Sequence, residues 1–248
     1  MKKNLFVGLC LALASVPLVL AQDAAVTTFT VAPSVFDPAT TDLVQALWLI
    51  GLGCPTNAGT SNSGHKQNGP PFTDPACPTG DSVDTQNEGL LLVKTGPTPN
   101  NAAATATING LPKKITLSEL GYDIRKPNSA SDSGGSHCGA GAPRFNVKTK
   151  DGNFYFIGCN SPSATTSTTN GSTTWIRLRW GNGTAGSVEG YNANQGNALQ
   201  AITSSVTDIS IVFDEGSDTG PDNFGAAILD NIDINGVLVG QGTNTASN

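Results

Sequence analysis

The feature that most constrains this chain is an alternation of apolar and polar side chains that recurs from residue 89 onward. Ile176, Leu178 and Trp180 alternate with polar neighbours, and the stretches 207–213 and 228–234 repeat the pattern. Successive side chains of a β-strand point to opposite faces, so this period is typical of half-buried strands rather than helices. Only 13% of the residues are charged, and 29 are glycine. The composition therefore favours strands joined by tight turns.

Turn residues separate most of these stretches, and no long helical pattern stands out between them. We predict an all-β protein, an antiparallel β-sandwich of the jelly-roll type with about eight or nine strands. The expected organisation is a signal peptide over 1–21, a polar N-terminal segment over 22–42, a single sandwich domain over 43–240 and a flexible tail over 241–248.

The strongest local prediction is a hairpin around Asp151-Gly152. This dipeptide suits a two-residue type I′ turn, and alternating apolar residues flank it. That register places Phe145, Val147, Phe154 and Phe156 on one face, which we assign to the core. Arg144 and Tyr155 then lie on the opposite face.

The N-terminus resembles an export leader. Lys2 and Lys3 precede the apolar run Leu5–Leu20, and the run ends in Val19-Leu20-Ala21. This order of charged, apolar and small residues predicts a secretory signal peptide cut before Gln22. We therefore expect a secreted, extracellular protein, with the periplasm or the cell surface also open, and no membrane insertion after cleavage.

The charge balance excludes one class of partner. The formal net charge is 13 − 19 = −6, and removal of the two leader lysines gives 11 − 19 = −8. A negative chain repels the phosphate backbone, so we expect no nucleic-acid partner.

Four cysteines remain after the leader: Cys54, Cys77, Cys138 and Cys159. In an exported chain four cysteines typically form two disulfides, and three pairings are open. We favour Cys54–Cys77 and Cys138–Cys159, each closing a loop of about twenty residues and contributing roughly 3 kcal/mol. The alternative is a zinc site with His65 and His137, but no Cys-x-x-Cys spacing supports it.

A candidate ligand-binding stripe follows from the same alternation. Trp175, Arg177 and Arg179 share the outward parity of one strand, and Tyr155 and Arg144 extend this face on the hairpin. Indole faces stack on sugar rings, and guanidinium groups donate paired hydrogen bonds. The alternative is that Trp175 packs at the sandwich edge and the arginines balance acidic groups.

Three segments carry a family resemblance. They are Trp48 to Gly53 with the later Glu88-Gly89-Leu90-Leu91-Leu92, then Ile209–Asp214, then Ile228–Ile234. Together they resemble the jelly-roll carbohydrate-binding modules of secreted polysaccharide-degrading systems. The resemblance spans residues 48–239 as a strand pattern. It implies binding of a polysaccharide or glycan surface, and a closing-strand aspartate that often binds a structural calcium.

In this sequence the closing-strand aspartate is Asp230. Without a bulge its parity points the carboxylate toward the core, where burial demands compensation. A structural calcium would supply that compensation, with co-ligands drawn from Asp214, Glu215, Asp218 and Asp222. The alternative is a loop cap or an ion pair with an arginine.

Three function classes remain. We favour a secreted, monomeric, non-catalytic protein that binds carbohydrate or a similar polymer. A structural or adhesive surface protein is the second class, suited by the low charge. A glycan hydrolase is the third, but the sequence places no pair of carboxylates for acid–base chemistry.

Overall fold

A computed structural model describes residues 24–54, 76–96, 102–125, 143–158, 161–162, 165–167, 175–214 and 225–243. Within these ranges the chain forms fourteen strands in two sheets, β1 to β14, and the only helical element is a 3₁₀ turn, Ala193–Gln195. Every strand pairing is antiparallel. No helix among the described residues is long and apolar enough to cross a membrane.

The first sheet, sheet A, has seven strands in the order β1-β4-β12-β6-β7-β10-β11. Their bounds are β1 Thr30–Phe36, β4 Ala103–Asn109, β12 Val206–Phe213, β6 Arg144–Thr149, β7 Phe154–Gly158, β10 Glu189–Asn192 and β11 Ala198–Ala201.

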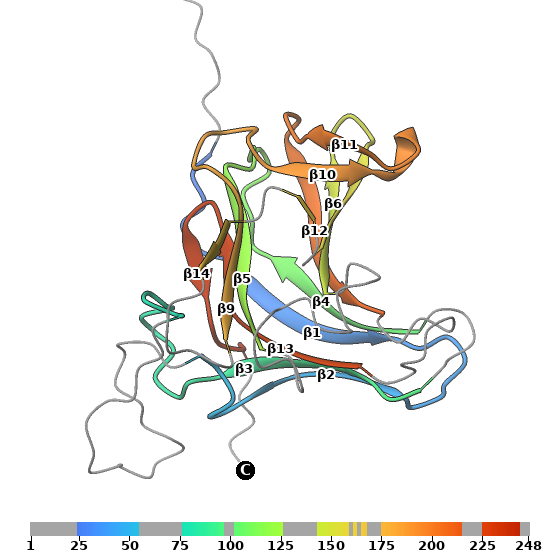
Figure 1. Ribbon diagram of the computed structural model, residues 1–248, viewed down its shortest axis with the longest axis vertical. Helices are drawn as coiled ribbons and strands as arrows, with labels where there is room; N and C mark the ends of the chain where they lie inside the picture. The colour runs from blue at the N-terminus through green and yellow to red at the C-terminus, as the bar shows by residue number, and fades with distance from the viewer. Residues whose placement is uncertain are drawn as a thin grey trace, which may run out of the picture.

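The second sheet, sheet B, has the order β2-β3-β13-β5-β9-β8, and β14 pairs with β13 beside this path. Their bounds are β2 Val44–Leu49, β3 Gly89–Lys94, β13 Gly225–Ile234, β5 Glu119–Arg125, β9 Ile176–Gly181, β8 Thr165–Ser167 and β14 Val237–Val239. Figure 1 shows the two sheets as facing layers, with β5 and β9 on one side and β6 and β12 on the other.

The core lies between the sheets and is formed by alternate residues of both. Trp180, Tyr122 and Phe145 are completely buried at its centre, with ring centroids 5.3 to 6.1 Å apart. The Tyr122 hydroxyl donates to the Pro143 carbonyl at 2.8 Å, which satisfies its polar end. The predicted antiparallel sandwich is confirmed, but its fourteen described strands exceed the predicted eight or nine.

The predicted hairpin exists, but its register was wrong by one residue. Val147 pairs with Tyr155, and Phe145 pairs with Ile157. The loop has three residues rather than two, because Gly152 takes φ +84° and donates to the Thr149 carbonyl. A type I turn followed by a left-handed glycine is the usual three-residue connection. Tyr155 therefore faces the core and is 4% exposed, which corrects its assignment to the outer face.

A bulge in β13 decides where Asp230 points. Asp230 pairs with Asp123, and Asp233, three residues later, pairs with Gly121, only two residues away. Asn231, with φ +45°, absorbs the extra residue. Asp230 consequently shares a face with Ile228 rather than with the inward Ile232. The condition attached to the prediction, that no bulge intervenes, does not hold.

Structured residues lie on both sides of the predicted domain 43–240. The segment 22–42 contains β1, an edge strand paired with β4 from Thr30 to Phe36. At the other end, Gly240 donates to Asp81 and Gly242 donates to Glu88, so backbone hydrogen bonds hold the start of the predicted tail against the fold.

Candidate functional site

Trp175 lies immediately before β9 and is only 3% exposed. It belongs to a small apolar cluster with Cys54, Cys77, Ala76 and Ile228. A buried indole offers no face to a ligand, so the predicted open stripe does not form around Trp175. The alternative for this residue was packing at the sandwich edge, and the structure buries Trp175 beside the Cys54–Cys77 disulfide.

Arg177 and Arg179 point to the same side as Trp175 but are engaged by carboxylates. Arg177 donates two hydrogen bonds to Asp123, from Nε at 2.8 Å and from Nη2 at 2.9 Å. Its Nη1 and Nη2 atoms also donate to Thr79. Arg179 lies 3.4 Å from Asp123 and 3.0 Å from Asp233. Both guanidinium groups therefore bind acids of this protein.

The pKa shifts of this network follow from burial and pairing. Burial lowers the pKa of Arg177, but the hydrogen bonds and charge of Asp123 outweigh it and leave the pKa raised. Arg179 is more buried, and burial lowers its pKa despite the charges of Asp123 and Asp233. Burial raises the pKa of Asp233 to about 7, although the charge of Arg179 opposes the rise. Such a network holds elements together and presents no open charge to a ligand.

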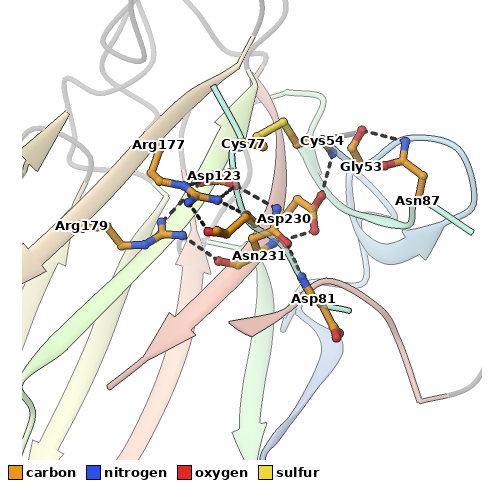
Figure 2. The surroundings of a disulfide bond; sticks show 11 residues. Gly53, Cys54, Cys77, Asp81, Asn87, Asp123, Arg177, Arg179, Asp230 and Asn231 are labelled. Carbon is orange, nitrogen blue, oxygen red and sulfur yellow. Dashed lines mark hydrogen bonds and ion pairs between the residues drawn. A yellow bond between two sulfur atoms is a disulfide. The ribbon is translucent and has the colours of Figure 1, made fainter. Parts of the chain in front are cut away.

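The disulfide Cys54–Cys77 is confirmed and lies beside this network (Figure 2). The Asp230 carboxylate accepts from the Cys54 N–H at 2.6 Å, and Asn231 accepts from the Asp81 N–H at 2.9 Å. The segment that carries Cys77 and Asp81 is thus held next to β13 directly through the Asp81–Asn231 hydrogen bond and indirectly through the disulfide to Cys54.

Asp230 itself is 1% exposed. Its second oxygen accepts from the Asn231 N–H at 2.5 Å. Burial, reinforced by the nearby charge of Asp123, raises the pKa of Asp230 well above the usual aspartate range. Both carboxylate oxygens thus accept from backbone N–H groups, one from Cys54 and one from Asn231.

Of the four residues predicted to share a calcium with Asp230, the structure describes Asp214. Asp214 lies at the end of β12 in sheet A, and both of its oxygens accept from Arg144, at 2.6 and 2.7 Å. Glu215, Asp218 and Asp222 lie outside the described residues.

Within the described ranges, one group of three ligand-type side chains is close enough to share an ion, namely Cys54, Cys77 and Asp123. It excludes Asp230, and its two sulfurs are already bonded to each other. The described residues therefore do not assemble the expected oxygen cage. Calcium at Asp230 stays a prediction.

The second predicted disulfide joins Cys138 and Cys159. Cys138 and Cys159 lie outside the described residues, as do His65 and His137 of the zinc alternative. The second disulfide stays a prediction for the same reason.

The outer face of sheet A presents a different set of residues. A row of register partners crosses all seven strands, and none of its members is buried. We call this the cross-strand row; it contains Leu199, Tyr191, Phe156, Asn146, Ser210, Thr107 and Ala32.

The two aromatic members of the cross-strand row, Phe156 and Tyr191, are neighbours in it, and we call this part its aromatic half. Phe156 is half-buried and packs edge-on against Phe154, with ring centroids 5.0 Å apart. Tyr191 is its register partner on β10. Arg144, a predicted site residue, lies on this same face with its guanidinium carbon 5.4 Å from the centroid of the Phe156 ring. Arg144 thus steadies the aromatic patch while Asp214 neutralises its charge.

Asn146 lies next to Phe156 in the row, and its Oδ1 atom is buried without a hydrogen-bond partner. A buried acceptor without a donor costs about 1–3 kcal/mol. The atom has almost no contact with solvent, so an external hydroxyl or amide donor reaches it only when the half-buried Asn146 side chain turns outward.

Sequence reasoning missed Phe154, Phe156, Tyr191 and Asn146. The assumed two-residue turn moved both phenylalanines into the core, because a one-residue slip reverses every side chain of a strand. The run Phe154-Tyr155-Phe156-Ile157 is aromatic or apolar throughout, so it is compatible with either register. Tyr191, in a segment rich in glycine and asparagine, carried no strand signal.

Comparisons with known proteins give two structural likenesses. One is a family 11 carbohydrate-binding module from Clostridium thermocellum, in complex with a β-1,3-1,4-mixed-linked tetrasaccharide. It has a TM-score of 0.38 and 12% identity over 84% of this chain and 90% of that one. The other is a family 11 carbohydrate-binding module of the cellulosomal cellulase Lic26A-Cel5E of Clostridium thermocellum. It has a TM-score of 0.35 and 13% identity over 90% of this chain and 94% of that one. No family model matches the sequence, and no curated protein does either.

Proposed function

We propose that this protein is an exported, non-catalytic binding protein whose outer sheet A face binds a carbohydrate chain along the aromatic half of the cross-strand row. The observation that carries the proposal is the unpartnered Asn146 Oδ1, which lies beside an accessible aromatic patch. A sugar offers both complements at once, an apolar ring face and hydroxyl donors.

The aromatic contribution comes from Phe156 and Tyr191. Both are half-buried, so their rings are held in place yet remain open to contact. Aromatic rings pack against the apolar C–H faces of pyranoses, and their limited freedom keeps the entropic cost of binding low. Phe154 supports Phe156 from the side.

The polar contribution comes from Asn146 and its neighbour Ser210. A hydroxyl that donates to Asn146 Oδ1 would remove the cost of the unpaired acceptor, and the Ser210 hydroxyl can donate or accept. Arg144 adds no free charge, because Asp214 holds two of its nitrogens. The face therefore suits a neutral sugar better than an acidic one.

Three features support export and a non-catalytic role. The leader predicts secretion, and the Cys54–Cys77 disulfide is typical of oxidising compartments. Asp214, the partner of Arg144 beside the aromatic patch, is committed to that ion pair and so is a poor general acid or base. We expect a monomer.

The test is the affinity of the mature protein for a panel of soluble and insoluble neutral polysaccharides. Phe156→Ala should weaken binding by about tenfold, the equivalent of roughly 1.4 kcal/mol of lost stacking. Phe36→Ala is the matched control, because Phe36 is an exposed aromatic, 54% accessible, on the opposite edge strand of sheet A.

Equal losses in the two variants would remove the assignment to the aromatic half of the row. Absence of wild-type binding to every polysaccharide would favour the structural or adhesive alternative. Release of reducing ends by the purified protein would establish hydrolysis in place of simple binding.

A further inference from the structure

A cavity lies away from the aromatic half of the cross-strand row and shares no residue with the row. Its volume is about 580 Å³, and it is lined by the N-terminal segment 27–30, the loop 81–88, β14 and residues 241–243. Phe29, Val83 and Val237 provide apolar walls, and Gln86 and Glu88 provide polar ones. This size lies within the range of small-molecule sites.

The charged groups of this cavity are carboxylates, and threonine hydroxyls and glutamine amides line the rest of its polar surface. Gln86 Oε1 is buried without a hydrogen-bond partner. Glu88 is 2% exposed and Asp81 is 8% exposed, and each carboxylate accepts a backbone N–H, from Gly242 at 2.9 Å and from Gly240 at 3.1 Å. The lining residues include no lysine, arginine or histidine.

Asp84 lies in the same loop, and its pKa depends on the burial and the charges around it. Burial raises its pKa to about 6, and the charges of Glu88 and Asp81 add to the rise, although N–H groups of Glu88 and Gln86 oppose it. A nearby cation would lower this pKa. Burial accounts for most of this shift, and the neighbouring charges that add to it are both carboxylates.

A chelated metal ion is poorly suited to this arrangement. Among the described residues, no three carboxylates here bring their oxygens within 4.8 Å of one another. The acceptors are spread around the cavity, so a cation must reach them through separate donors. A primary ammonium group has three such donors on one charged centre.

We propose that this cavity binds a small primary amine, whose ammonium group donates to Gln86 Oε1 and is held by the charges of Glu88 and Asp81. The stem of the amine contacts Phe29, Val83 and Val237. An amino sugar and an alkylamine both carry such an ammonium group. What the two share is a cation with three N–H donors.

The experiment compares D-glucosamine with D-glucose, which differ in the ammonium group, by calorimetry and by NMR shifts of the Gln86 side-chain amide. Glucosamine should bind the wild type and glucose should not. Gln86→Ala should weaken glucosamine binding by roughly tenfold. Gln45→Ala is the matched control, because Gln45 is exposed on β2 and does not line the cavity.

Gln86→Ala should fold normally, because its amide oxygen has no partner to lose; equal melting temperatures would verify this. n-Pentylamine forms the second arm, and its binding would show that the ammonium group suffices. Equal binding of glucose and glucosamine, binding of neither amine, or full affinity in Gln86→Ala would each overturn the proposal.

The two sites can fail separately. Phe156→Ala should keep glucosamine binding at the cavity, and Gln86→Ala should keep polysaccharide binding on sheet A. Loss of glucosamine binding in Phe156→Ala alone would instead place the amine on the cross-strand row and overturn the cavity assignment.

Discussion

Replacement of Cys54 and Cys77 by alanine tests how the outer face of sheet B is covered. The bond joins residues 23 positions apart in the sequence and fixes the loop that leads to β3. Both cysteines are buried beside Trp175. The double variant keeps the backbone N–H of residue 54, so its hydrogen bond to Asp230 survives the substitution.

The expected cost follows from loop closure. For a separation of 23 residues, the chain-entropy relation gives about 3.4 kcal/mol of lost stability at 25 °C. In a domain of this size, each kcal/mol lowers the melting temperature by about 2–4 °C. The double variant should therefore melt about 7–14 °C below the wild type.

Urea unfolding measures the free energy of unfolding, and thermal unfolding measures the melting temperature. Tryptophan fluorescence can follow both, since Trp175 packs against the disulfide. Wild-type protein held in a reducing agent is the control; it should lose at least as much stability, and more if the predicted Cys138–Cys159 bond is also reduced. A change below about 1 kcal/mol in both samples would refute the entropic argument. It would show that the bonds from Asp81 to Asn231 and from Arg177 to Thr79 already close the loop.

Two other predictions concern buried acids. The pKa of Asp84 is raised from 3.8 to about 6 in the folded state, so the folded protein binds the proton more tightly and stability falls as pH rises through this window. Asp84→Asn keeps an acceptor for the Gln86 and Glu88 N–H groups and should flatten that fall; melting curves at about pH 4 and pH 7 measure it, and an unchanged slope would contradict it. If Asp230 binds calcium, a chelator should lower the melting temperature and added calcium should restore it, whereas an unchanged melt would remove the ion.

Part of the candidate site was predictable from sequence. Arg144 was assigned to the outer face of the hairpin, and it lies there, beside Phe156. The strand β6 that carries it was also predicted. The face of its neighbour Phe156 was predicted wrongly, because Asp151-Gly152 suits both a two-residue and a three-residue loop, and only the hydrogen bond from Gly152 to Thr149 distinguishes them.

The prediction for Trp175 failed for a different reason. Alternation gives the face of a sheet to which a side chain points, and Trp175 does lie opposite the inward set of β9. It does not say whether another segment covers that face. Cys54, Ala76 and Cys77 pack over it, and Trp175 is buried against them.

By itself, the sequence determined the fold class, most strand positions and one disulfide, because these depend on local alternation, turn residues and the chemistry of cysteine. The tertiary structure decided which outer face is open. It brought Asp123 to Arg177 across neighbouring strands and turned Asp230 away from the core through a bulge at Asn231. Such contacts join residues far apart along the chain, and a single added residue in a loop or strand reverses their direction.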